Sequence, residues 1–169
     1  MSDIGDKLWN TSVSPANYSD STDRYNSAIL EQYKICVEMA DRVSTRRNLT
    51  NTFFLSLNSA VVAVISLKSD QSLATTSVWL LAAGLAILVA QCAAWFVMVR
   101  SYRQLNAAKY AVIGAFEERL PAFAYSRAEW GLLGNGSDWR RYLPLTHVER
   151  WVPAIFSAAY VVGFLSIVT

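Results

Sequence analysis

Charged side chains are scarce in this chain, and the places where they are missing matter more than their total. Lys, Arg, Asp and Glu make up 17% of the 169 residues, against roughly 25% in soluble domains. Two long segments, residues 48–67 and residues 71–99, contain none of them. A bilayer core about 30 Å thick needs roughly 20 apolar residues per helix, and both segments are long enough. We therefore predict membrane-spanning helices, because lone strands would leave backbone groups unpaired in lipid.

Residue types that carry most enzyme chemistry are also rare. The chain has one histidine, His147, and two cysteines, Cys36 and Cys92. These three residues do not have metal-ligand spacing, and the sequence contains no phosphate-binding loop, nucleophile elbow or paired-cysteine motif. We therefore expect neither an enzyme nor a protein that depends on a metal or cofactor. The net charge of +2 gives no reason to expect a nucleic-acid partner.

A third uncharged segment, residues 151–169, follows the capping pattern Thr146-His-Val-Glu149. With the first two segments, it predicts an all-α integral membrane protein with three transmembrane helices. Arginines flank the same end of all three segments: Arg46, Arg47, Arg100, Arg103 and Arg150. Because basic residues concentrate on the cytoplasmic side of a membrane, we expect a cytoplasmic N-terminus and a periplasmic C-terminus.

Helical patterns continue beyond the first two spans. A seam with spacings of 4, 3, 4 and 3 comprises Ile29, Tyr33, Cys36, Ala40 and Val43, and a second comprises Leu105, Ala108, Val112 and Ala115. Both seams predict long cytosolic stalk helices continuous with the spans. Glu38 and Lys109 lie at similar distances from the membrane, and we predict that this stalk pair is close in space.

The pattern divides the chain into five parts. Residues 1–22 form a flexible N-terminal arm, because they are polar with few apolar anchors. A stalk helix continuous with the first span covers 23–67, and the second span continuous with the second stalk covers 71–120. An aromatic connector covers 121–145, on the stalks or at the membrane interface. The third span covers 146–169.

Polar residues at membrane depth are the main candidates for a function. One face of the first span carries small and hydroxyl-bearing side chains, and two amides lie at similar depth. The candidate pore-lining residues are Thr52, Ser56, Asn58, Ser59, Ser66 and Gln91. Such groups can line a polar cavity, but small residues and amides can equally serve helix packing. Both interpretations remain open, and a pore would need several copies.

A second cluster lies where the third span meets the membrane surface. It consists of His147, Glu149, Arg150 and Trp151, which combine charged groups with an aromatic anchor typical of the interface. Adjacent Glu117 and Glu118 point about 100° apart on a helix and are predicted to be a solvated face rather than a catalytic pair.

Three separated blocks resemble one known family. They are EQYKICVEMADRVSTRRNLTNTFFLSLNSAVVAVISL, RSYRQLNAAKYAVIGAFEERLP and YLPLTHVERWVPAIF, and they resemble the bacterial RipA-like family of octameric membrane proteins. The resemblance covers roughly residues 30 to 168. It implies a ring-like homo-oligomer in the bacterial inner membrane. The order of stalk, two spans and stalk is also similar to SLATT-type membrane effectors, a class that implies pores in antiphage systems.

Two functions follow as hypotheses. The first is a homo-oligomeric channel or pore-type effector that a cytosolic sensor protein or small ligand gates through the stalks. It would act by depolarising the membrane, with antiphage defence as the expected setting. The alternative is a non-conducting scaffold that recruits partners in a stress response. In both, the expected partners are further copies of the chain and the lipid bilayer.

Overall fold

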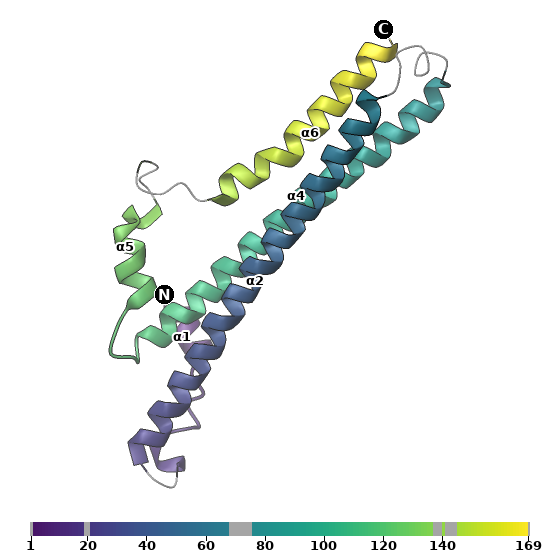
Figure 1. Ribbon diagram of the computed structural model, residues 1–169. Coiled ribbons are helices and arrows are strands. Elements are labelled where there is room, and N and C mark those ends of the chain that lie inside the picture. Colours follow the sequence, from purple (N-terminus) through teal and green to yellow (C-terminus); the bar gives the residue numbers. More distant parts are fainter. Residues whose placement is uncertain (1, 19–20, 68–75, 137–139, 141–144, 169) are drawn as a thin grey trace. The chain divides into compact units, whose positions relative to one another are not determined.

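The computed structural model describes residues 2–18, 21–67, 76–136, 140 and 145–168, with the backbone alone described at 2–3, 21–22, 135 and 145–147. Every regular element in these ranges is helical, which confirms the all-α class. The helices in chain order are α1 (Ser2–Leu8), η1 (Pro15–Asn17), α2 (Ser21–Ser66), α4 (Val78–Glu117), η2 (Ala124–Glu129), α5 (Trp130–Leu132), η3 (Gly134–Gly136) and α6 (Leu145–Val168) (Figure 1).

Three of the described helices, α2, α4 and α6, are long and apolar enough to cross a membrane. This confirms the three predicted spans. At 1.5 Å per residue, α2 with 46 residues and α4 with 40 residues are about 69 Å and 60 Å long. Each is about twice the thickness of a bilayer core. Both therefore continue outside the membrane as the predicted stalks.

The chain divides into two compact units. The stalk unit comprises Met1–Thr45 and Gln104–Leu143, and the membrane unit comprises Arg46–Arg103 and Pro144–Thr169. Each unit takes one part of α2 and one part of α4. The boundary on α2 lies beside the arginines that precede its uncharged segment.

The stalk unit confirms one predicted packing face and corrects the first half of the other. On α2, Ile29, Ala40 and Val43 are at most 7% exposed. On α4, Ala115 is 7% exposed and Val112 is partly buried, but Leu105 and Ala108 are exposed, so the predicted seam is wrong in its first half. Asn106 and Lys109, one position further along, are partly buried there instead. Sequence reasoning missed these two positions because both residues are polar.

Aromatic side chains hold the three helices of the membrane unit together. Phe54 of α2 stacks on Trp95 of α4, with ring centres 5.6 Å apart and an angle of 9° between the ring planes. Phe156 of α6 also contacts Trp95, with ring centres 6.3 Å apart. Trp95 is 2% exposed. One buried indole on α4 thus contacts aromatic rings of both α2 and α6.

Some predicted features lie outside the described residues. They are the first residues of the predicted second span, 71–75, and residues 137–139 and 141–144 of the predicted connector.

Candidate functional site

Asn58 of α2 is fully buried at the centre of the membrane unit. Its side-chain oxygen Oδ1 accepts a hydrogen bond from the Tyr160 hydroxyl of α6 at 2.8 Å. The Cys92 thiol of α4 also donates to Oδ1, at 3.6 Å. The amide nitrogen Nδ2 donates to the carbonyl oxygen of Phe54 at 2.8 Å. One amide therefore joins all three spans, and both ends of that amide are bonded.

A second polar contact lies closer to the stalk end of the same unit. The indole nitrogen Nε1 of Trp95 donates to Oδ1 of Asn51 at 3.0 Å. Beyond it, the Arg47 and Glu149 side chains form an ion pair with Nε and Oε2 3.6 Å apart, and only 14% and 18% of these side chains are exposed. Polar contacts thus continue from mid-span to the arginines at the end of the helix.

The predicted pore-lining residues divide into two groups. Four hydroxyl-bearing residues of α2 are exposed in the subunit, and they form the hydroxyl stripe: Thr52, Ser56, Ser59 and Ser66. Asn58 lies in the helix interface instead, because each residue turns a helix by about 100° and Asn58 is thus about 120° from the stripe. Gln91 is partly buried, and its nitrogen Nε2 has no partner among the described residues. Whether these six residues line a path stays a prediction, since a path would form between subunits.

The span of α4 carries a matching exposed face of small residues. It consists of Ala83, Ala86, Ala90 and Ala94, which are all exposed, while Cys92 and Trp95 on the opposite side are buried. Small residues let helices approach closely in lipid. Both α2 and α4 therefore turn a smooth face away from the subunit's own core.

The predicted interface cluster is distributed over several contacts. Glu149 pairs with Arg47, Arg150 is partly buried, and Trp151 is 67% exposed. The backbone of His147 belongs to α6, but its side chain lies outside the described residues. Arg47 is the partner of Glu149 that sequence reasoning missed, because the two residues are distant in the chain.

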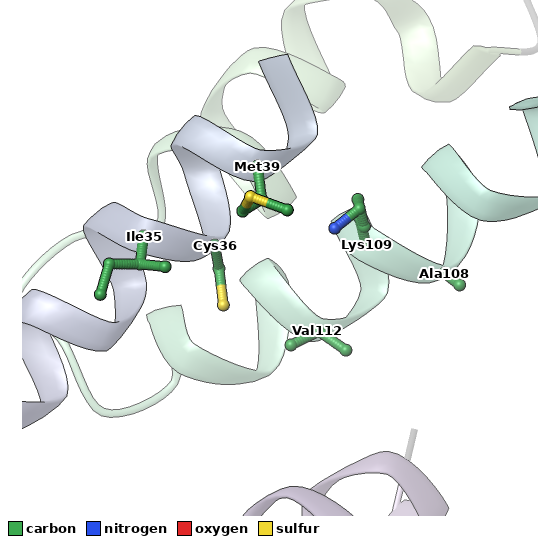
Figure 2. Close-up of a pocket in the computed structure, with 6 residues that line it drawn as sticks. All are labelled: Ile35, Cys36, Met39, Ala108, Lys109 and Val112. Carbon is green, nitrogen blue, oxygen red and sulfur yellow. The ribbon is translucent and has the colours of Figure 1, made fainter. Parts of the chain in front are cut away.

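The members of the predicted stalk pair have different surroundings. Glu38 accepts from Arg42 on its own helix at 2.7 Å. Lys109 lines a shallow apolar pocket of about 260 Å³, which we call the stalk pocket: Ile35, Cys36, Met39, Ala108, Lys109 and Val112. Figure 2 shows the side chains of Met39 and Lys109 facing each other across it. Ile35 and Met39 are 57% and 41% exposed, which leaves this pocket open.

Glu117, at the end of α4, is a site that sequence reasoning got wrong. It is fully buried, not solvated, although Glu118 beside it is exposed as predicted. Its carboxylate accepts from the backbone nitrogens of Tyr125 and Ser126 at 2.8 Å and 2.9 Å. The Ser126 hydroxyl also donates to it, and so does the Tyr33 hydroxyl, at 3.3 Å. The sequence did offer one signal for this burial: Glu117 lies four residues after apolar Ile113, and residues four apart share a helix face.

These contacts join the connector to both stalk helices. The Glu117 carboxylate binds two backbone nitrogens in the first turn of η2. A helix N-terminus favours negative charge. Gly114 allows the close approach, because a Cβ atom there would lie 3.3 Å from Cβ of Ser126.

Charge at Glu117 is stabilised despite its burial. Burial alone would raise the pKa of Glu117, but the hydrogen bonds from Ser126, Tyr125 and Tyr33 outweigh it and lower the pKa below its ordinary 4.5. Burial and the neighbouring Glu117 carboxylate raise the pKa of Tyr33 to about 12. The site therefore pairs an ionised carboxylate with a neutral phenol at neutral pH.

The N-terminal arm contains helix α1 and a tryptophan that contacts the stalk. Trp9 lies against Phe116 with ring centres 5.4 Å apart, and the Arg119 guanidinium lies 3.6 Å from the Trp9 ring centre. Arg119 also donates to the Tyr25 hydroxyl at 3.2 Å. Trp9 thus packs on the end of α4 in its own chain.

A family model agrees with the three-span architecture. The octameric membrane protein family (8xMP) matches residues 30–169. The chain belongs to this family. The match confirms the resemblance to octameric membrane proteins and omits the N-terminal arm, as the resemblance did. No curated protein and no solved structure matches the chain.

Membership of the octameric membrane protein family implies that some of the exposed faces contact other copies of the chain. A subunit that associates with copies of itself in a membrane must present surfaces to them. The hydroxyl stripe of α2, the alanine face of α4 and the stalk pocket are all exposed within their units. These surfaces are available for contacts between subunits or with other molecules.

Proposed function

We propose that this protein is a channel-type effector of the bacterial inner membrane, formed by eight copies, and not an enzyme. The observation that carries the proposal is the hydroxyl stripe. The side chain of Asn58 is buried and forms its hydrogen bonds within the subunit. By contrast, Thr52, Ser56 and Ser59 on the same helix are exposed at membrane depth. Polar groups inside a membrane usually face a bundle interior or a water-filled cavity.

The alanine face of α4 complements this arrangement. In lipid, helix association depends on close packing more than on burial of apolar surface. We place the alanine face against the neighbouring subunit, and the deeper part of the hydroxyl stripe, Ser56, Ser59 and Ser66, on the axis of the ring.

Orientation and gating follow from the charges outside the spans. The arginines at one end of each span support a cytoplasmic N-terminus and a periplasmic C-terminus. The stalks then extend into the cytoplasm, where a sensor protein or small ligand acts on them. Each charge that crosses a potential of 100 mV releases about 2.3 kcal/mol. Opening therefore depolarises the membrane, which would serve antiphage defence.

Conductance of the purified octamer in a planar bilayer tests the proposal. We expect discrete currents, abolished by Ser56→Leu and Ser59→Leu at unchanged octamer mass. Ser59→Ala controls for loss of the hydroxyl alone, and Val64→Leu adds bulk at an exposed position outside the stripe. Normal currents in both leucine variants would contradict the stripe as the path.

A non-conducting scaffold is the second candidate, and the open stalk pocket favours it. Exposed Ile35 and Met39 offer a partner an apolar contact outside the membrane. A scaffold predicts that Met39→Glu abolishes the cellular phenotype while Ser59→Leu leaves it intact. A channel predicts that Ser59→Leu abolishes it.

A further inference from the structure

An open groove of about 310 Å³ lies in the membrane unit and is lined by residues of α2, α4 and α6. Its polar wall consists of Asn48, Asn51, Thr52 and Glu149, and its apolar wall of Leu55, Trp95 and Val152. We call it the interface pocket. It is separate from the hydrogen bonds of Asn58.

The interface pocket lies where two spans meet the membrane surface. Asn48 is the first residue of one uncharged segment, and Glu149 comes two residues before another. Exposed Trp151 is typical of the same level. From Asn48 to Leu55 the pocket extends about 10 Å along α2. It therefore runs from the headgroup region toward the hydrocarbon.

Polarity changes along the pocket in the same direction. Asn48, Asn51, Thr52 and Glu149 provide amides, a hydroxyl and a carboxylate near the surface. Leu55 and Val152 follow at greater depth. Trp95 bonds the oxygen of Asn51, so the remaining polar group of that side chain is its Nδ2 donor. A ligand that fits must accept hydrogen bonds at one end and continue as an apolar chain.

Glu149 supplies the negative charge of the pocket lining. Its ion pair with Arg47 is long, because Oε2 and Nε are 3.6 Å apart, too far for a good hydrogen bond. Both of these atoms are enclosed by the subunit and have no hydrogen-bond partner among the described residues. An ammonium group in the pocket would add a second cation beside the same carboxylate.

We propose that the interface pocket binds a phospholipid whose headgroup carries a primary ammonium, the phosphatidylethanolamine class. The ammonium donates to Glu149. The phosphate accepts from the amides of Asn48 and Asn51 and from the hydroxyl of Thr52. The start of an acyl chain lies along Leu55 and Val152. Because the pocket contains a carboxylate, a headgroup with a positive end fits it better than an anionic one.

Native mass spectrometry of the detergent-purified octamer tests this assignment. Phosphatidylethanolamine, phosphatidylcholine and phosphatidylglycerol with identical acyl chains are added separately. Phosphatidylcholine is the decisive comparison, because its methylated ammonium cannot donate hydrogen bonds. We expect phosphatidylethanolamine to bind about tenfold more tightly than phosphatidylcholine, and Glu149→Gln to remove that preference. Glu38→Gln, at a stalk carboxylate that is 61% exposed, is the control and keeps the preference.

Three results would overturn the proposal. Equal binding of the first two lipids would remove the role of the ammonium. Preference for phosphatidylglycerol would show that the arginines attract anionic lipid without using the pocket. Absence of bound lipid would show that the pocket is not a lipid site. If Glu149→Gln fails to assemble, Thr52→Val provides the second variant, with weaker binding of all phospholipids expected.

Lipid binding is measured whether or not the octamer conducts. Lost preference in a conducting octamer would overturn only the lipid site. A silent octamer that retains the preference would overturn only the channel.

Discussion

The hydroxyl of Tyr160 donates a 2.8 Å hydrogen bond to the side-chain oxygen of Asn58, which lies 102 positions earlier in the chain. This bond joins the last span to the first. The Cys92 thiol of the second span donates to the same oxygen. In lipid, burial of apolar surface does not drive helices to associate with specific partners. A shared polar acceptor therefore helps to specify how these three spans pack.

Tyr160→Phe tests this bond without changing the shape of the side chain. We expect the free energy of unfolding to fall by roughly 0.6 to 1.7 kcal/mol, the range of hydrogen bonds inside membranes. Reversible unfolding of the detergent-solubilised protein by added SDS measures it. Tyr102→Phe is the matched control, because the Tyr102 hydroxyl lies 3.5 Å from its partner on Thr50. An equal loss in both variants would contradict the importance of the Asn58 contact.

Glu117→Gln is expected to loosen the connector from the stalk. A charged acceptor contributes about 1.5 to 3 kcal/mol per hydrogen bond, and a neutral amide cannot accept on both ends. The measurement is hydrogen exchange at the backbone amides of Tyr125 and Ser126, which should become faster. Glu118→Gln changes the exposed neighbour and should leave these amides protected. Unchanged exchange in Glu117→Gln would show that η2 holds its position by other contacts.

Acid should weaken the stalk unit through the same carboxylate. The pKa of Glu117 is lower in the folded protein than its ordinary 4.5, so folding favours the ionised form. This contribution is fully present above pH 4.5 and is lost as pH falls through the folded pKa. Thermal unfolding followed from neutral pH to about pH 3 should show the difference between wild type and Glu117→Gln shrinking with acidity. A difference independent of pH would mean that charge plays no part.

The spans were predictable because the physical signal is local. Uncharged segments long enough to cross a bilayer are visible in the sequence alone, and so was the seam at Ile29, Ala40 and Val43. The seam on α4 was predicted at Val112 and Ala115 but not at its start, where Asn106 and Lys109 are partly buried in place of Leu105 and Ala108. Hydrophobic periodicity assigns such polar positions to the surface.

Sites that depend on distant partners were harder to predict. Glu117 looked solvated because the atoms that bind it belong to Tyr33, Tyr125 and Ser126, in separate segments. Asn58 was found as a polar group at membrane depth, but its partners on the other spans could not be identified from spacing. The hydroxyl stripe was visible in sequence, since its members share one helix face.

Trp9→Ala should release α1 from the end of α4. The ring loses its edge contact with Phe116 and its position under the Arg119 guanidinium, an interaction worth roughly 0.5 to 1 kcal/mol at exposed sites. Hydrogen exchange of α1 should become faster, and Trp9→Phe should restore part of the protection. Trp79→Ala is the control, because that side chain is 86% exposed. The family match begins at residue 30, so we expect octamer mass to stay unchanged in Trp9→Ala. A smaller assembly in that variant would show that the arm also contacts a neighbouring subunit.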